Sequence, residues 1–247
     1  MTVVSTTDER ALVRRLLVDH SVAGAEDFGR FVNDRRYFDT SSFDSKAATP
    51  VLIEALPFLT DPGVIETVAL HLKNPAARPA AFGALHTAFL EWGAVRRGRV
   101  GWQLGEALVN AAPIRETSLV LAIATDSAYG TNRQPVVLGL PRFRRAPETE
   151  RALRELVHDI DVAQQAMYSL RRVVGPQLTV DALEDVRSAH PDSTLERLAR
   201  HEIRKINRTL RRHDAETAAA VAAAVALPVT DSLAPADDAP PLDAITV

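Results

Sequence analysis

Apolar residues recur at intervals of three and four along most of this chain, which is the spacing of one face of an α-helix. Two segments show the pattern in the same phase, each through three residues that are four positions apart. These residues are Val64, Val68 and Leu72 in one segment and Val162, Ala166 and Leu170 in the other. No segment alternates apolar and polar residues convincingly over the length of a strand. The pattern therefore predicts an all-α protein.

Capping signals and helix breakers divide the chain into short helices, about a dozen in all. Thr49-Pro50 and Asp61-Pro62 each place an N-cap residue directly before a proline, which favours the start of a helix. Ser193-Thr-Leu-Glu196 has the form of a capping box and predicts the start of another helix. A separate alanine-rich helix is predicted over Ala215–Ala226.

Two segments, Leu59–Leu72 and Leu156–Val173, resemble HEAT repeats, in which pairs of antiparallel helices stack into a solenoid. The resemblance covers Thr49–Val186. It departs from the family at Ile65 and Ala163, where the second helix of a HEAT repeat usually carries an arginine. The resemblance implies an α-α superhelix of HEAT-like or armadillo-like type, and an irregular helical bundle is the alternative.

Composition changes along the chain suggest four parts. Residues 1–48 are predicted to form an N-terminal helical cap, 49–213 the HEAT-like repeats, and 214–226 the alanine-rich helix. Residues 227–247 are rich in Pro, Ala and Asp, and we expect them to form a disordered acidic tail. Bulky rings concentrate near the N-terminus, where they would close the exposed end of a repeat array; they are Phe28, Phe31, Tyr37, Phe38 and Phe43.

Charge is distributed unevenly, although the formal net charge of the whole chain is only −3. Arg197–Arg212 contains Glu202 as its only acid, whereas the chain after it carries no Lys or Arg at all. The absence of cysteine excludes disulfides and thiolate metal sites and suits the cytoplasm. No apolar run approaches the ~20 residues of a membrane span, and we see no signal peptide, so we expect a cytoplasmic protein without a membrane partner.

The basic segment predicts an amphipathic helix. At 100° per residue, an apolar side containing Ile203 and Ile206 lies opposite a basic side. The candidate partner-binding residues on and beside the basic side are Arg197, Arg200, Arg204, Arg208, Arg211 and Arg212. A basic side of this kind faces solvent, an acidic partner, a nucleic-acid backbone or the acidic tail.

Candidate catalytic groups are sparse, since the chain has no nucleophile elbow, P-loop, dinucleotide fingerprint or His-Glu-x-x-His motif. The single dipeptide His201-Glu202 is similar to the iron-binding dipeptides of the HEAT enzyme deoxyhypusine hydroxylase, which needs several of them. His158, Asp159 and Asp161 resemble a set of metal ligands, but a capped junction between two helices is the favoured interpretation. No cofactor or metal is predicted.

The leading hypothesis is therefore a non-enzymatic scaffold or adaptor that binds another macromolecule, with a protein favoured over a nucleic acid. The alternative rests on the AlkD-like DNA glycosylases, which are HEAT-like solenoids that present Trp and Asp to an alkylated base. Trp92, Trp102 and Asp126 would be the corresponding residues here. The pattern predicts no particular oligomeric state.

Overall fold

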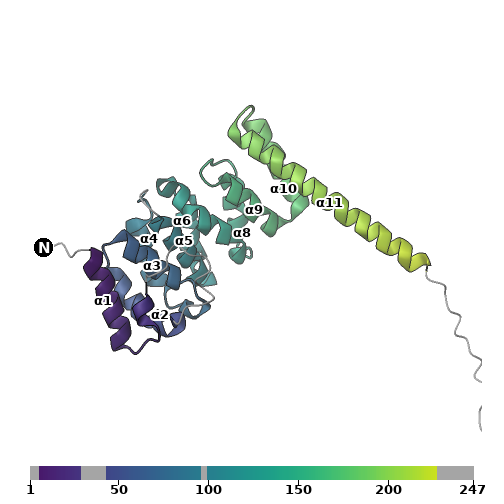
Figure 1. The fold of residues 1–247 in the computed structure, drawn as a ribbon. Coiled ribbons are helices and arrows are strands. Elements are labelled where there is room, and N and C mark those ends of the chain that lie inside the picture. Colours follow the sequence, from purple (N-terminus) through teal and green to yellow (C-terminus); the bar gives the residue numbers. More distant parts are fainter. Residues whose placement is uncertain (1–5, 29–42, 96–98, 227–247) are drawn as a thin grey trace, which may run out of the picture. The chain divides into compact units, whose positions relative to one another are not determined.

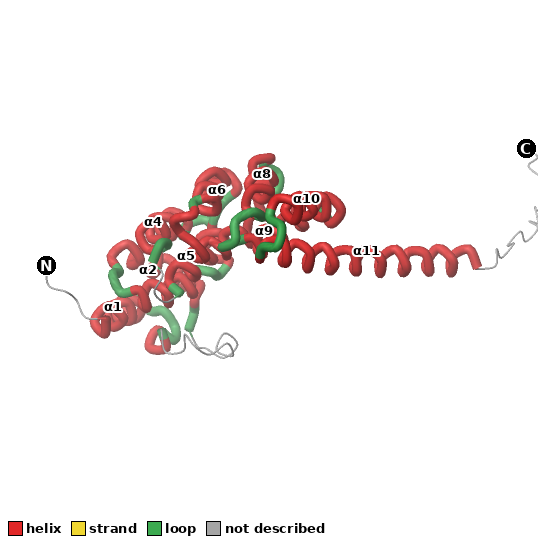
Figure 2. Tube along the Cα trace, turned by 90° about the horizontal axis from the view of Figure 1, so that it is seen from above, coloured by secondary structure: helices red, strands yellow, loops and turns green. Residues whose placement is uncertain are grey.

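The computed structural model describes residues 6–28, 43–95 and 99–226, and every regular element within these ranges is a helix (Figures 1 and 2). The all-α prediction is confirmed for them. Contacts divide the chain into two units, Met1–Ile206 and Asn207–Val247. The expected disordered tail, 227–247, lies outside the described residues, as do Phe31, Tyr37 and Phe38.

The α-helices are α1 (Thr6–Asp19), α2 (Ser45–Ala55), α3 (Pro62–His71), α4 (Phe82–Trp92), α5 (Val100–Ala111), α6 (Thr117–Thr125), α7 (Gln134–Gly139), α8 (Pro147–Leu156), α9 (Ala163–Val174), α10 (Pro176–Ala189) and α11 (Thr194–Ala226). Short 3-10 helices join several of them: η1 (Ala25–Asp27), η3 (Leu56–Phe58), η4 (Pro75–Ala77), η5 (Ile114–Glu116), η6 (Ser127–Arg133) and η7 (Leu140–Phe143).

Alternate helices of the first unit pack on one another in a continuous series. α1 contacts α3, α3 contacts α5, α5 contacts α7 and α7 contacts α9. The intervening helices contact the members of this series beside them, as α4 does with α5 and α8 with α9. Figure 1 labels α1, α3, α5 and α9 of this series.

The helix start predicted at Asp61-Pro62 is confirmed. The carboxylate of Asp61 accepts a hydrogen bond from the Val64 amide at 2.8 Å, so it satisfies one of the free donors at the start of α3. Val64, Val68 and Leu72 are all buried, as the helical spacing requires.

The helix start predicted at Thr49-Pro50 is wrong, because α2 begins at Ser45, five residues before Pro50. Asp44 is the N-cap residue, and its carboxylate accepts bonds from two amides of the first turn, at 3.0 and 2.9 Å. Thr49 instead lies inside the helix, where its hydroxyl donates to the Ser45 carbonyl at 2.9 Å. The predicted boundary between residues 48 and 49 therefore falls within α2.

The separate alanine-rich helix is also wrong, because α11 runs unbroken from Thr194 to Ala226. No Gly or Pro interrupts this stretch, and alanine has the highest helix propensity, so nothing ends the helix at residue 213. The predicted start is confirmed, since the Ser193 hydroxyl accepts from the Glu196 amide at 3.1 Å. The Glu196 side chain bonds to Arg200 rather than back to the N-cap.

Towards the C-terminal end of the first unit, α9 packs on α7, α8 and α10. Leu170 of α9 is fully buried, and the neighbouring Ser169 hydroxyl donates to the Val137 carbonyl of α7 at 2.9 Å. Small residues on the same face, among them Ala163 and Ala166, let the helices approach closely.

Leu170→Ala should lower the free energy of unfolding by about 2–4 kcal/mol, because truncation leaves a cavity between helices that cannot close fully. The measurement is the shift of the urea unfolding midpoint. Leu178→Ala is the matched control, since Leu178 is 51% exposed and its truncation should change stability by less than about 0.5 kcal/mol. Equal shifts for both variants would contradict the packing described for α9.

An aromatic cluster joins the first unit's N-terminal elements. The rings of Phe28 and Phe43 lie 5.5 Å and 4.5 Å from that of His71, measured between centroids, and both phenylalanines are buried. Phe28 and Phe43 are two of the five rings from which the N-terminal cap was predicted. Burial lowers the pKa of His71 from 6.5 to about 4, because the enclosed site disfavours the imidazolium.

The folded protein should therefore lose stability as the pH falls from about 6.5 towards 4, since the unfolded chain takes up a proton at His71 before the folded chain does. Because His71 is only partly buried, we expect a loss of about 2 kcal/mol. His71→Phe should reduce this pH dependence, and exposed His201→Phe should not, as measured by urea unfolding at neutral and acidic pH. Identical pH profiles for the His71 variant and the parent would contradict the assignment.

Candidate functional site

The predicted phase of the basic helix is confirmed in α11. Leu195, Ala199, Ile203 and Ile206 are buried, whereas Leu198 and Leu210 are half-exposed. The six candidate arginines are all exposed, and we call them the basic face of α11: Arg197, Arg200, Arg204, Arg208, Arg211 and Arg212. The first three belong to the first unit and the last three to the second.

Half of the basic face is already engaged with other side chains of the helix. Arg200 forms an ion pair with Glu196, Arg212 lies 3.6 Å from Glu216, and Arg197 donates to the Thr194 hydroxyl at 3.0 Å. Arg204, Arg208 and Arg211 show no hydrogen bond or ion pair within the part of the chain that the structure describes. Their guanidinium groups are therefore free to bind an anionic group.

The single acid in the basic segment does not neutralise these arginines. Glu202 is turned towards α9, where it accepts from Arg171 at 2.9 Å, and its second oxygen lies 3.5 Å from Lys205. The Glu202 side chain is only 14% exposed. The pair with Arg171 attaches α11 to α9, and no other acid lies within residues 197–212.

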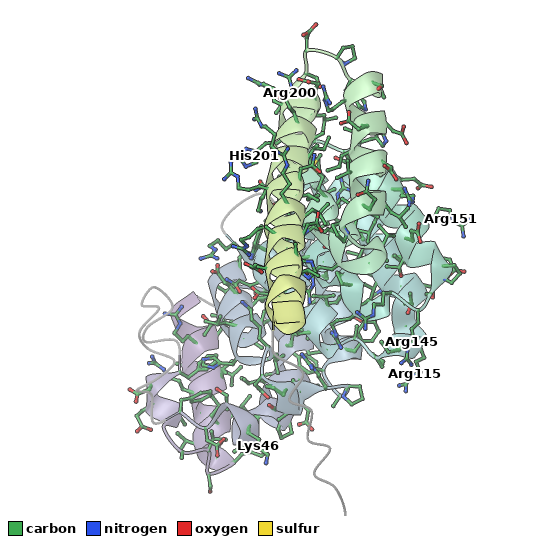
Figure 3. All side chains as sticks on the ribbon, turned by 90° about the vertical axis from the view of Figure 1, so that its right-hand side faces the viewer. Lys46, Arg115, Arg145, Arg151, Arg200 and His201 are labelled. Atoms are coloured by element: carbon green, nitrogen blue, oxygen red, sulfur yellow. The ribbon has the colours of Figure 1, made fainter. Side chains whose placement is uncertain are left out.

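A second candidate site is an open cleft of about 470 Å³ along one face of α8. It combines acidic and basic groups, and Glu150 and Arg154 form an ion pair across one helical turn at 2.9 Å. Arg151 extends from this region towards solvent in Figure 3. The cleft's mixture of carboxylates, guanidinium groups and one imidazole is suited to holding a charged group. Its lining residues are Pro147, Glu150, Arg151, Arg154, Glu155 and His158.

The acidic residues between α8 and α9 form a structural junction rather than a cluster of metal ligands. One oxygen of Asp159 pairs with the guanidinium of Arg133, and the other accepts from the Asp161 amide at 3.0 Å. Arg133 is fully buried and also donates to the carbonyls of Gly130 and Ala124, both at 3.1 Å. Among the described residues, no group of three or more His, Cys, Asp or Glu side chains is placed to hold a metal ion.

Arg133 was not among the candidate residues identified from the sequence. It is the largest of the fully buried side chains, and it links the end of α6 and the turn of η6 to the junction between α8 and α9. No local signal marks it, because its partners are two backbone carbonyls and an aspartate 26 positions away. The nearest signal is Gly130, whose φ of 51° allows the turn that brings a carbonyl to the guanidinium.

The residues of the glycosylase alternative lie on neighbouring segments. Trp92 ends α4 and Trp102 lies in the first turn of α5, and both are half-buried. Asn132 of η6 donates to the carbonyls of Gly93 and Val95, at 2.9 and 3.0 Å, so it holds the end of α4 against η6. Asp126, at the start of η6, uses its carboxylate to accept from the Ala128 amide at 2.9 Å.

Tyr129 lies near Asp126, and its hydroxyl feels both burial and the charge of that carboxylate. Burial raises the pKa of the Tyr129 hydroxyl, and the nearby Asp126 carboxylate raises it further. The Tyr129 ring packs on Phe89 of α4 at 4.9 Å between centroids. Asp126 therefore acts here as a helix cap beside an uncharged tyrosine.

Comparisons of the chain with models of protein families, with curated proteins and with solved structures find no match. Within the described ranges, the structure contains no helix that is both long and apolar enough to span a membrane. The exposed charges and the residues around them are therefore the basis for a functional proposal.

Arg133→Met should lower the free energy of unfolding by about 3–5 kcal/mol, because it leaves a partly buried carboxylate and two carbonyls without their donor. Arg151→Met, on the exposed face of α8, should change it by less than about 0.5 kcal/mol. Denaturant unfolding of both variants measures the difference. A small effect at Arg133 would show that water replaces the guanidinium at little cost.

Proposed function

We propose that this protein is a non-enzymatic, HEAT-like helical-repeat scaffold that binds an acidic segment of another protein through the basic face of α11. The continuous series α1–α3–α5–α7–α9 supports the repeat architecture, because stacked helix pairs produce contacts between alternate helices. The basic face supports the choice of an acidic partner, because positive and negative surfaces attract and orient each other before contact.

The observation that carries the proposal is the spacing of Arg204, Arg208 and Arg211. They follow one another at intervals of four and three along α11, they are exposed, and they have no ion pair among the described residues. Three such groups lie along roughly 10 Å of a helix at 1.5 Å per residue. A glutamate-rich or aspartate-rich segment presents carboxylates at a comparable spacing.

Two observations favour a protein over duplex DNA. The net charge of −3 opposes long-range attraction to any anionic partner, and most strongly to duplex DNA, which carries about one negative charge per 1.7 Å of its length. Asp126 is committed to capping η6 in the described structure, which weakens its candidacy as the carboxylate of a glycosylase. The proximity of the two tryptophan-bearing helix ends to η6 keeps DNA binding as a measurable alternative.

A fluorescent glutamate-rich peptide should bind the full chain, and its affinity should fall as the NaCl concentration rises. Changing Arg204, Arg208 and Arg211 together to Ala should weaken binding about tenfold, since exposed ion pairs contribute roughly 0.5 kcal/mol each. Fluorescence anisotropy measures the affinity, and circular dichroism checks that α11 remains helical.

The matched control replaces Arg115, Arg144 and Arg145 by Ala, which removes the same charge from exposed positions. Figure 3 shows Arg115 and Arg145 on a different part of the first unit from Arg200. The control variant should bind the peptide as the parent does. An equal loss in both variants would contradict a specific site, since only net charge would then matter.

Binding of the chain to duplex DNA tests the glycosylase alternative. We expect no sub-micromolar binding at physiological salt. If the basic face did bind DNA through about three phosphates, the logarithm of affinity would fall against the logarithm of salt with a slope near −3. Tight DNA binding that the arginine triple variant abolishes would replace the protein-scaffold proposal with the glycosylase hypothesis.

A further inference from the structure

Two histidines from different helices meet at the surface of the first unit. His158 follows the last turn of α8, and His190 is the C-cap residue of α10; both helices pack on α9. The Nδ1 atom of His158 lies 2.9 Å from Nε2 of His190, and the ring centroids are 5.2 Å apart. His158 is exposed and His190 is half-exposed. Residues 32 positions apart thus bring two nitrogen donors together.

We propose that His158 and His190 bind a divalent transition-metal ion of the kind that prefers imidazole, for which Zn²⁺ is the probe. With Zn–N bonds of about 2.0–2.1 Å and a tetrahedral angle of about 109°, two ligand nitrogens lie roughly 3.3–3.4 Å apart. The two nitrogens are 2.9 Å apart in the hydrogen-bonded arrangement, so they must separate by about 0.4–0.5 Å to bind the ion. The ion replaces the proton that the two rings share.

Exposure is what allows the exchange of proton for metal. In the hydrogen-bonded arrangement the two nitrogens point towards each other, with the rings tilted by 49°. To bind an ion, both rings must turn. The lone pair on Nδ1 of His158 and the lone pair on Nε2 of His190 then point at one ion, which lies to the side of the line between the two nitrogens. Exposed side chains can make this rotation, whereas rings packed in a core could not.

The site differs from a closed structural zinc site. No third His, Cys, Asp or Glu joins the pair among the described residues, so two coordination positions are left to water. The chain has no cysteine, so no thiolate competes with the imidazoles for the ion. Glu155, one helical turn before His158 in the α8 cleft, adds negative charge nearby. We therefore expect an exchangeable ion that connects the C-terminal ends of α8 and α10.

Isothermal titration calorimetry of the tag-free full chain with ZnCl₂ tests the site. A single Zn²⁺ ion per chain should bind. His158→Gln and His190→Gln should each weaken binding at least tenfold, because even the loss of an outer partner of a metal ligand costs about 10–100-fold. His201→Gln is the matched control, since Figure 3 shows His201 on α11, and it should leave the affinity unchanged.

NMR provides a second measurement, made on the parent chain. Proton–carbon NMR spectra of the parent chain should show ring signals of His158 and His190, assigned from the two variants, that shift when Zn²⁺ is added. Mg²⁺ should not shift them, because it prefers oxygen ligands. Unchanged ring signals at millimolar Zn²⁺, or equal affinity in the parent and both variants, would show that the pair is a hydrogen bond only and would overturn the proposal.

Discussion

The buried guanidinium of Arg133 is the interaction on which the middle of the first unit depends. A charged group removed from water needs a full set of partners, and Arg133 finds them in the Asp159 carboxylate and the carbonyls of Gly130 and Ala124. These partners belong to the end of α6, the turn of η6 and the junction of α8 with α9. One side chain therefore satisfies groups from all three segments at once.

The ends of short helices leave backbone amides and carbonyls without a hydrogen-bond partner. Charged side chains bond to these groups at other helix ends as well. Arg142 donates to three carbonyls at the end of α5. Glu9 of α1 accepts from the Thr60 and Asp61 amides just before α3, at 2.9–3.1 Å. Burial alone would raise the pKa of Glu9, but these bonds and one from the Thr60 hydroxyl hold it below its usual value. The helices are thereby fixed to one another by their ends as well as by their apolar faces.

Features with a local cause could be predicted from the sequence, and features with a distant cause could not. The cap at Asp61, the burial of Leu170 and the two sides of α11 follow from spacing within one helix. The wrong start at Thr49 arose because Asp44, five residues earlier, also offers a capping side chain. Arg133 and the pair of His158 with His190 depend on tertiary contacts 26 and 32 residues apart, which no local pattern encodes. The exposure of the basic face was predictable, whereas its lack of ion-pair partners at three positions required the structure.

We propose that an acidic protein segment binds at the basic face of α11, away from the tryptophans of α4 and α5. Hydrogen–deuterium exchange of the full chain, with and without a glutamate-rich peptide, locates the bound segment. Exchange should become slower within residues 197–212 and should stay unchanged within 89–95 and 99–105. Slower exchange within 89–95 and 99–105, with unchanged exchange in 197–212, would rule out binding at the basic face.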